Sequence, residues 1–459
     1  MNRAEARRLS LLVVLAAVAC SGDSVAPSEP TFLGATVEQN PLNVLSGILT
    51  VEAVGFDSAS ARYWTGAEEP RSTPAYPFAS DSTVRVPVLG LRETTSYQVE
   101  TIVYAGGQPL SADTATLNSG LLPSWIPGIG ALGSDTTPGF LAISIKDGGV
   151  IVNNEGRVVW YAHRPGGVLN SFQSHANGTY TLRGQDGTIN VLNVFGEDIG
   201  TIGCVGFESR FHDVMILADG STWMMCDDTR VMDLSAIGGD AAAEVTATVI
   251  QHISAGGQVL FQWNAFDHFE LTDLPAEDRA GPSVNFTHGN ALELDTDGNL
   301  LASFRSLSEI TKIDATSGDV IWRFGGLASE FTILNDPKGA FQRQHGVRLA
   351  GPAQIQFLDN GTSAPSRMVR YLLNPVQHTA LLVMSFEDSP ATFTPVGGGT
   401  DYYPNGNGVV SFGQAGRVVE ADAAGNRAWE LTGVDGLYVF RAERIASLYD
   451  PGTLSRRDR

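Results

Sequence analysis

Two short patterns recur along the sequence from about residue 130 to residue 448, and internal repetition of this kind restricts the fold more than local propensity does. The first pattern is a turn of Asn or Asp followed by Gly that precedes an apolar strand. The second is a Gly followed by a strand that ends in an aromatic residue. The turns are Asn177-Gly178, Asp219-Gly220, Asp297-Gly298 and Asn405-Gly406, and the strands run from Gly156 to Trp160, Gly257 to Phe261, Gly318 to Trp322 and Gly425 to Trp429.

The spacing of these copies indicates a repeating unit of about 50 residues, the length of a four-stranded blade in a β-propeller. Trp322 and Trp429 stand close to two periods apart, as do Trp160 and Phe261, so each pair encloses a degenerate copy. About six such units fit into residues 131–448. The sequence therefore predicts an all-β chain whose larger part is a six-bladed β-propeller, with the aromatic residues packed between blades.

Residues 31–118 show a different β pattern, in which short alternating runs of apolar and polar residues are separated by turn residues. This pattern predicts a small N-terminal β-sandwich. The stretch ending at Tyr97, with Leu91 and Thr95 before it, resembles the tyrosine corner of fibronectin type III domains, although Glu93 replaces the usual Pro. We assign residues 119–130 to a linker and residues 449–459 to a C-terminal tail.

The composition narrows the classes of partner. The formal net charge is −21 and no run of Lys or Arg offsets it, so a nucleic-acid backbone would be repelled. The 51 Gly and 22 Pro residues, with a charged fraction of only 17%, are typical of a turn-rich β protein. We therefore expect no nucleic-acid partner.

The first residues have the form of an export signal, with a basic start and an apolar run, residues 11–19, that is too short to span a bilayer. The residues up to Cys20 resemble a bacterial lipoprotein box, with Ala17 where Leu is usual. On this interpretation residues 1–20 are the signal peptide, Cys20 carries a lipid and residues 21–30 are a tether. Ordinary secretion is the alternative. Either way we expect an exported protein, periplasmic or on the outer membrane of a bacterium, that meets the membrane only through a lipid anchor.

Two further cysteines, Cys204 and Cys226, could form a disulfide in an oxidising compartment. A bridge closing a loop of that length would contribute about 3 kcal/mol. Two buried free thiols are the alternative.

Three of the eight histidines share one context in the repeat. His212, His288 and His345 each stand a few residues ahead of the turn of their repeat, with an alternating apolar strand between. The first strand of a propeller blade lines the central channel, so we expect the three side chains to stand just ahead of inner strands and to meet at one mouth of the channel. The other histidines show no such register and are expected to be structural: His163, His175, His252, His268 and His378.

The neighbours of these histidines indicate the chemistry of the expected site. Asn290 stands two residues after His288, and Arg305 lies in the strand that follows. A guanidinium, an amide and imidazoles around a channel mouth would bind a tetrahedral oxyanion. An exposed or ion-paired strand charge is the alternative for Arg305. Three histidines also suggest zinc, but each comes from a separate repeat without a nearby second histidine, so we expect no metal.

The stretch from His288 to His345 resembles the bacterial arylsulfate sulfotransferases that do not depend on 3′-phosphoadenosine phosphosulfate. It contains His288-Gly289-Asn290, the strand ending in Arg305, and Gln344-His345. The resemblance implies a small β-sandwich joined to a six-bladed propeller, and no cofactor. It also implies that His345 is the nucleophile, forming an N-sulfohistidine, that His288 and Arg305 hold the sulfonate oxygens, and that Asn290 is a substrate-binding amide.

The resemblance also extends to the rest of the site, with one departure. It makes His212 the remaining channel histidine, which could act as an acid or base, but Phe211 stands where the family often has a second histidine. A hydroxyl from the last blade, which is Gly-rich at residues 397–399, has no clear match.

The implied reaction is ping-pong transfer of a sulfuryl group from a phenolic sulfate donor to a phenolic acceptor. Two other functions remain open. One is an exported propeller lipoprotein without catalytic activity that binds a glycan or a protein at the channel mouth. The other is a propeller dehydrogenase with a quinone cofactor, which we disfavour because no acidic cluster for its calcium is evident. The natural phenols and the oligomeric state, with a homodimer as one option, are not indicated by the sequence.

Overall fold

The structure is a computed structural model that describes residues 29–79, 82–145, 148–165, 171–184 and 187–452. Almost all of its regular structure is β-strand, with five short 3-10 helices, so the predicted all-β class is confirmed. In the described part of the chain, no helix is long and apolar enough to cross a membrane. The predicted signal peptide, Cys20 and nearly all of the predicted tether lie outside the described residues.

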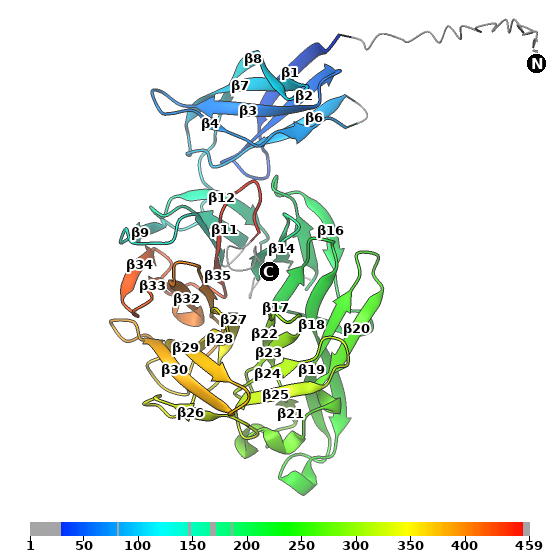
Figure 1. The fold of residues 1–459 in the computed structure, drawn as a ribbon, viewed down its shortest axis with the longest axis vertical. Coiled ribbons are helices and arrows are strands. Elements are labelled where there is room, and N and C mark those ends of the chain that lie inside the picture. Colours follow the sequence, from blue (N-terminus) through cyan, green and yellow to red (C-terminus); the bar gives the residue numbers. More distant parts are fainter. Residues whose placement is uncertain (1–28, 80–81, 146–147, 166–170, 185–186, 453–459) are drawn as a thin grey trace, which may run out of the picture.

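Two sheets form the N-terminal part, at the top of Figure 1. Apolar side chains from both sheets, such as Val51 and Val99, pack into one shared core. The hydroxyl of buried Tyr97 accepts a hydrogen bond of 2.9 Å from the backbone nitrogen of Arg92, which is the bond expected at a tyrosine corner. One sheet contains β1 (Thr31–Gln39), β2 (Gly47–Val54) and β6 (Thr83–Val88); the other contains β3 (Ser58–Trp64), β4 (Arg71–Ser72), β5 (Tyr76–Pro77), β7 (Ser96–Ala105) and β8 (Gln108–Asn118).

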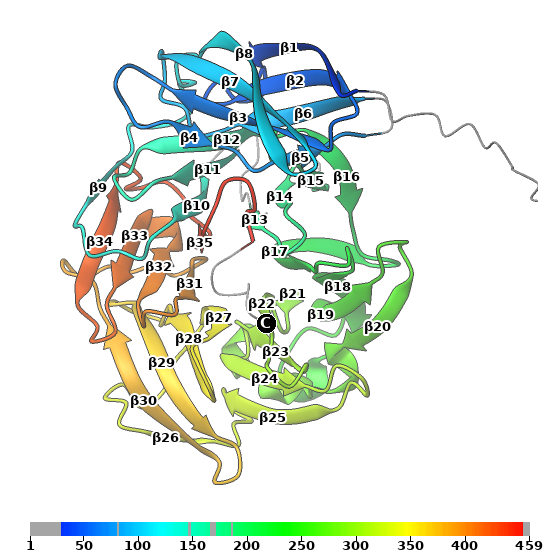
Figure 2. The ribbon, with the colours of Figure 1, turned by 45° about the horizontal axis from the view of Figure 1, so that its top comes forward.

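The rest of the chain forms six further sheets, which lie around a common centre in Figure 2. In chain order, the first sheet contains β10 (Phe140–Ile145), β11 (Gly148–Val152) and β12 (Val158–His163). The second contains β13 (Phe172–Ser174), β14 (Tyr180–Arg183), β15 (Ile189–Leu192) and β16 (Asp198–Ile202). The third contains β17 (Glu208–Ile216), β18 (Thr222–Met232), β19 (Ala243–Ile253), β20 (Val259–Asn264) and β21 (Ser283–Asn285). The fourth contains β22 (Gly289–Leu294), β23 (Leu300–Phe304), β24 (Glu309–Ile313) and β25 (Val320–Gly325). The fifth contains β26 (Thr332–Leu334), β27 (His345–Leu349), β28 (Gln354–Asp359), β29 (Arg367–Asn374) and β30 (Thr379–Phe386). The last contains β31 (Gly399–Tyr402), β32 (Gly408–Phe412), β33 (Arg417–Ala421) and β34 (Arg427–Thr432).

The two ends of this region are exchanged between adjacent sheets. β9 (Gly130–Leu132), from the start of the region, pairs with β34 in the last sheet. β35 (Ala442–Ile445), from its end, pairs with β10 in the first sheet. Strands far apart in the sequence therefore join the first and last sheets, so backbone hydrogen bonds hold the start and the end of the region together.

The repeats seen in the sequence correspond to equivalent places in these sheets. The Gly of each Asn-Gly or Asp-Gly turn has a positive φ, between 80° and 90°, as a tight turn before a strand requires: Gly178, Gly220, Gly298 and Gly406. Trp160, Trp322 and Trp429 are buried and lie in β12, β25 and β34. β12 and β25 are the end strands of their sheets, and β34 has only β9 beyond it. The two degenerate copies correspond to the sheet of β13–β16 and the sheet of β27–β30. β16 contains no aromatic residue, and β30 ends in buried Phe386 without the Gly that opens the pattern.

Cys204 and Cys226 form a disulfide with 6.1 Å between their Cα atoms. It links the segment before β17 to buried Cys226 in β18, within the sheet that carries His212.

Candidate active site

The three predicted histidines lie together where three neighbouring sheets meet the centre. His212 lies inside β17, His288 directly precedes β22, and His345 opens β27. The ring centroids of His212 and His288 are 4.9 Å apart, and those of His288 and His345 are 6.3 Å apart. The structure therefore brings the three side chains together as expected. The prediction that His212 stands just ahead of its strand is wrong, because β17 already begins at Glu208.

The strands at these three positions have irregular pairing at the histidine or directly after it. The register between β17 and β18 shifts between Ser209 and Val214, that between β22 and β23 shifts between Gly289 and Ala291, and that between β27 and β28 shifts between His345 and Arg348. Bulges of this kind interrupt the pairing and redirect side chains, and they are frequent beside active sites. The alternation of a regular strand therefore does not set the directions of these side chains.

His345 is buried, and one of its ring nitrogens is held by two acceptors. Its Nδ1 lies 2.7 Å from Oδ1 of Asn360 and 3.1 Å from the carbonyl oxygen of Arg343. Both partners can only accept, so Nδ1 carries the proton and Nε2 keeps its lone pair. This is the tautomer that a nucleophilic imidazole needs.

Asn360 is itself fixed in orientation. Its Nδ2 donates to the carbonyl oxygens of Thr394, at 2.9 Å, and Gly397, at 3.0 Å. Because both of these partners are acceptors, the amide nitrogen must face them and Oδ1 must face His345. Sequence reasoning missed this buried residue, since it follows β28 and belongs to neither of the repeated patterns.

His288 is half-buried and adopts a backbone conformation that is uncommon for a residue with a side chain. Its φ is +50°, in the left-handed region. Strained positions of this kind cluster at functional sites. Nδ2 of Asn285 donates to Nδ1 of His288 over 2.8 Å, so the neutral ring carries its proton on Nε2. His288 therefore offers an N–H donor where His345 offers a lone pair.

The electrostatics of the site keep the imidazoles neutral. Burial lowers the pKa of His345 to about 4, against the opposing effect of the hydrogen bond to Asn360 and with the help of the Arg305 charge. At neutral pH, His345 is therefore unprotonated on Nε2.

The pKa values of the other two histidines are lowered for similar reasons. Burial, the neighbouring His288 and the charge of Arg210 hold the pKa of His212 well below its usual range. Burial and the charge of Arg210 do the same to the pKa of His288. The site thus contains three neutral imidazoles among cations, which is an environment that favours a bound anion.

Arg305 lies within electrostatic reach of two of these rings, since its charge lowers the pKa values of His288 and His345. Its Nη2 donates to the carbonyl oxygen of Pro395 over 3.2 Å. Its Nε is buried and makes no hydrogen bond within the described residues. No carboxylate of the described chain pairs with this guanidinium, so it keeps donors and charge for a ligand.

Asn290, the expected substrate-binding amide, bonds to the backbone next to His345. Its Nδ2 donates to the carbonyl oxygen of Gln344 over 2.9 Å, and its Oδ1 accepts from the backbone nitrogen of Gly346 over 3.2 Å. The buried amide therefore spans the two residues that flank His345 and holds that part of β27 against β22.

Tyr438 brings a hydroxyl close to Gly397, in the Gly-rich stretch where sequence reasoning left the hydroxyl unassigned. A Cβ atom on Gly397, whose φ is +68°, would lie 2.1 Å from the hydroxyl oxygen of Tyr438, so only glycine leaves room for it. Burial raises the pKa of Tyr438 to about 12, although the charges of Arg441 and Arg305 oppose the rise. The hydroxyl therefore keeps its proton and can donate it in a hydrogen bond. The residue lies outside both repeated patterns, so the sequence offered no signal for it.

Buried arginine and aspartate side chains connect the inner strands next to the histidines. Arg441 donates to the carbonyl oxygens of His212, at 2.5 Å, and Asn290, at 3.0 Å, and lies 3.5 Å from Asp213. Asp213 also accepts from Nη1 of Arg348 at 3.1 Å. Because all of these groups are buried, the network ties neighbouring inner strands together and supports the positions of the site residues.

The remaining histidines have neighbours elsewhere, as expected. His175 bonds to Thr181 and His252 to Ser221, while the rings of His163 and His268 stack on tryptophans. His378 lies 3.7 Å from a carboxylate oxygen of Glu330. Among the residues that the structure describes, no group of three His, Cys, Asp or Glu side chains is arranged to hold a metal ion.

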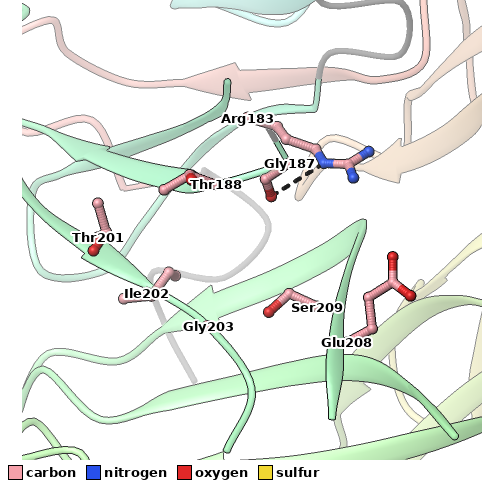
Figure 3. A pocket seen from close by; sticks show the side chains of 8 residues that line it. All are labelled: Arg183, Gly187, Thr188, Thr201, Ile202, Gly203, Glu208 and Ser209. Carbon is pink, nitrogen blue, oxygen red and sulfur yellow. Dashed lines mark hydrogen bonds between the residues drawn. The ribbon is translucent and has the colours of Figure 1, made fainter. Parts of the chain in front are cut away.

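A pocket of about 420 Å³ lies near the start of β17 and does not contain the histidines. It is lined by residues of β14, β16 and β17 and of the adjoining loops, including Thr201, Glu208 and Ser209 (Figure 3). Beside it, Nε of Arg183 donates to the carbonyl oxygen of Gly187 over 3.3 Å.

Comparison with known proteins identifies a family for most of this region. Residues 142–434 match the family model described as arylsulfotransferase. No curated protein matched the sequence.

Solved structures give only distant matches. They include an inactive virginiamycin B lyase from Staphylococcus aureus with quinupristin (10% identity, TM-score 0.37, covering 66% of this chain and 88% of that one). A streptogramin B lyase has 11% identity and a TM-score of 0.26, covering 89% of this chain and 95% of that one. A protein of unknown function from Bacteroides thetaiotaomicron has 13% identity and a TM-score of 0.26, covering 89% of this chain and 98% of that one. Similarity at this level carries no argument about function.

Proposed function

The chain belongs to the arylsulfotransferase family, and we propose that it moves a sulfuryl group from a phenolic sulfate ester to a phenolic acceptor by way of an N-sulfohistidine on His345. The observation that carries this proposal is the arrangement of His345, whose Nδ1 is engaged by Asn360 and the Arg343 carbonyl while Nε2 keeps its lone pair. A neutral imidazole of this kind is a good nucleophile near pH 7.

In the first half of the reaction, the lone pair on Nε2 of His345 forms a bond to sulfur as the bond from sulfur to the aryl oxygen breaks. The leaving group takes the electron pair as a phenolate. The ring becomes positively charged, because Nδ1 keeps its proton, and the acceptors Asn360 and the Arg343 carbonyl stabilise that charge. In the second half, a phenolate acceptor attacks the same sulfur and the electron pair of the N–S bond returns to Nε2.

Displacement at sulfur resembles phosphoryl transfer, with charge on the oxygens of the transferring group and an in-line transition state. We assign the Arg305 guanidinium and the Nε2–H of His288 as the donors to those oxygens, since neither donor group is fully used within the described chain. Tyr438 is a further neutral donor beside Arg305. Catalysis by such groups is electrostatic, since they are oriented before the charge develops.

The depressed pKa values of the histidines bear on the acid and base steps. In the free protein, burial keeps His212 and His288 neutral, so neither starts as a protonated acid at neutral pH. The negative charge of an entering sulfate ester favours protonation of the nearest imidazole. A good leaving group such as 4-nitrophenolate departs without a proton, whereas a poorly leaving phenol depends on this substrate-induced acid.

We further propose that the six sheets of residues 131–448 are propeller blades and that residues 31–118 form a fibronectin type III-like sandwich. Export with a lipid on Cys20, and hence a periplasmic or outer-membrane location, belongs to the same proposal. The strand exchange between the first and last sheets and the Tyr97 hydrogen bond support the two folds.

The test of the proposed function is mass spectrometry of the intact protein after exposure to 4-nitrophenyl sulfate alone. We expect one added sulfuryl group per chain, removed by mild acid, together with a stoichiometric burst of 4-nitrophenolate. Addition of phenol should then remove the label and restore the original mass.

Two outcomes would contradict this proposal in different ways. Steady release of 4-nitrophenolate with no covalent adduct would indicate direct transfer without a sulfohistidine. A protein that neither gains mass nor releases 4-nitrophenolate would be a binding protein instead of an enzyme of this class.

We expect Asn360→Leu to reduce kcat/KM by about 10-fold to 100-fold, because a hydrogen bond to a charged group contributes about 1.5–3 kcal/mol. Without Asn360, Nδ1 of His345 keeps only the Arg343 carbonyl as an acceptor, and the charge that develops on the ring loses its nearer partner. The hydrogen bond to Asn360 raises the pKa of His345, so its loss should also shift the acid limb of the pH profile to lower pH.

Asn43→Ala is a matched control, since Asn43 is another buried asparagine whose amide donates to a backbone carbonyl, that of Tyr161. It should lower thermal stability without moving the pH profile. An Asn360→Leu protein with an unchanged profile and an unchanged kcat/KM would show that Asn360 only supports the fold.

The pH dependence of kcat/KM follows from the state of the nucleophile in the free enzyme. Because the pKa of His345 is lowered to about 4, we expect kcat/KM to stay level as pH falls from neutrality and to decline with a midpoint near pH 4. A decline centred near pH 6.5, the usual value for histidine, would contradict the assignment.

The same shift affects stability. An unfolded His345 binds a proton below about pH 6.5, whereas the folded one does not until about pH 4. The unfolded state therefore binds more protons in this interval, and the free energy of unfolding decreases as pH falls through it. Circular dichroism at each pH separates this loss of fold from titration of the nucleophile.

A further inference from the structure

A second pocket lies at the seam between the N-terminal sheets and the first of the six sheets, and it shares no residue with the site at the histidines. Its volume is about 390 Å³. Tyr63 and Arg71 line it from the N-terminal part, Phe140 and Arg157 line it from the first of the six sheets, and Tyr449 lines it from the segment after β35. Figure 2 shows the N-terminal sheets lying directly above β11 and β12 at this seam.

The two guanidinium groups in this pocket are held next to one another. Nη1 of Arg71 donates to the carbonyl oxygen of Gly90 over 3.0 Å, and Nη1 of Arg157 donates to that of Leu91 over 3.3 Å. These are consecutive carbonyl groups. Burial lowers the pKa of Arg157, and the charge of Arg71 lowers it further, as expected for two neighbouring cations.

Neither guanidinium has a carboxylate partner at ion-pair distance among the described residues. The charge of Glu155 favours the charged form of Arg157 without forming such a pair. By contrast, three other arginines of the N-terminal part each pair with a Glu side chain: Arg62, Arg85 and Arg92. In a chain with a net charge of −21, two adjacent arginines that line one cavity without counter-ions form a local positive site.

The other walls of the pocket indicate what kind of anion would fit. The hydroxyls of Tyr63 and Tyr449 bond to each other at 3.0 Å and to the backbone of Leu89, so they already have partners. Arg71 lies over the Tyr63 ring, with 4.6 Å between the guanidinium carbon and the ring centroid. Apolar side chains complete the lining: Leu89, Phe140, Val159 and Leu448. The cavity is therefore cationic at Arg71 and Arg157 and apolar elsewhere.

We propose that this seam pocket binds a small organic anion that consists of an oxyanion group on an apolar body. Planar guanidinium groups bind the oxygens of a carboxylate, sulfonate or phosphonate in pairs, and the apolar walls enclose the rest of the ligand. Because the ligand contacts both the N-terminal sheets and the first of the six sheets, binding stabilises their association. The proposal is independent of sulfuryl transfer.

The test measures the thermal unfolding of the full chain carrying Arg305→Gln, so that the site at the histidines contributes less to anion binding. The probes are phenylphosphonate, inorganic phosphate and phenol, compared at constant ionic strength. We expect phenylphosphonate to raise Tm saturably by a few degrees, with half-saturation at a concentration at least tenfold lower than for phosphate, and phenol to have no effect.

Substitutions of the two arginines provide the decisive comparison. Arg71→Gln and Arg157→Gln, each in the same background, should raise the half-saturation concentration at least about tenfold, because each removes charge-assisted hydrogen bonds. Arg85→Gln is the matched control, since Arg85 also joins the N-terminal part to the rest of the chain but pairs with Glu197, and it should leave the titration unchanged.

Several outcomes would overturn the proposal. Multivalent anions stabilise proteins in general, so an equal rise in Tm in all variants would mean that phenylphosphonate does not bind at this seam. A rise with phenol, or an equal response to phosphate and phenylphosphonate, would contradict the proposed oxyanion on an apolar body. If the glutamine variants do not fold, equilibrium dialysis of phenylphosphonate against the Arg305→Gln protein decides, and binding well below one equivalent per chain rejects the site.

Discussion

A His345→Ala protein should release 4-nitrophenolate from 4-nitrophenyl sulfate at least about 10⁴-fold more slowly than the wild type, because removing a covalent nucleophile eliminates the route through the intermediate. We assign the role of nucleophile to this residue because its Nδ1 is engaged by two acceptors and its Nε2 is not protonated. The measurement is the initial rate of 4-nitrophenolate release with phenol as acceptor, together with the intact mass after donor alone.

The control for this variant is His252→Ala. His252 is partly buried, bonds to Ser221 and stacks on Trp223, but it lies outside the site. It should retain the wild-type rate and the sulfuryl adduct. If the His345→Ala protein still gained the adduct, another residue would be the nucleophile, and the neighbouring His288 would be tested next.

Replacing Arg305 by glutamine should lower kcat by about 100-fold to 1,000-fold, the usual effect of removing one preorganised donor from a developing negative charge. The guanidinium has no carboxylate partner in the described chain and has a buried Nε without a hydrogen bond, so its donors are available to the transferring group. Arg305→Lys keeps the charge but loses the planar fork, and should recover only part of the rate. Single-turnover formation of the adduct measures the affected step directly.

The pattern of kinetic constants tests this role. A group that acts in the transition state lowers kcat, whereas one that only binds the ground state raises KM and leaves kcat unchanged. Arg62→Gln, which breaks an exposed ion pair with Glu100 in the N-terminal part, is the control and should change neither constant. If Arg305→Gln raises KM and leaves kcat unchanged, Arg305 binds the substrate but does not stabilise the transition state.

The sequence by itself determined the features that repeat or that depend on neighbours along the chain. Equivalent strands of a repeat face equivalent surroundings, so the turns at Gly178 and Gly298 recur, as do the aromatic residues Trp322 and Trp429. The length of the repeat can therefore be read from the sequence without a structure. The same register indicated that His212, His288 and His345 converge. A repeated local pattern is enough to predict the repeat length and the meeting of the histidines, because each copy adopts the same local structure.

Only the tertiary structure decided what each polar group in the site does. Asn290 matched a substrate-binding amide in the sequence, yet its amide bonds to the backbone on both sides of His345. Asn360 and Tyr438 carry no local signal, and their positions result from contacts with residues far along the chain.

The physical reason is that hydrogen bonding and burial depend on which strands meet, and on bulges that turn side chains out of the regular alternation. The tautomer and the depressed pKa of His345 follow from such contacts between distant residues. So does the placement of Arg71 beside Arg157 at the seam. The sequence therefore indicated where the chemistry lies, and the packing of the sheets decided which atoms are free to perform it.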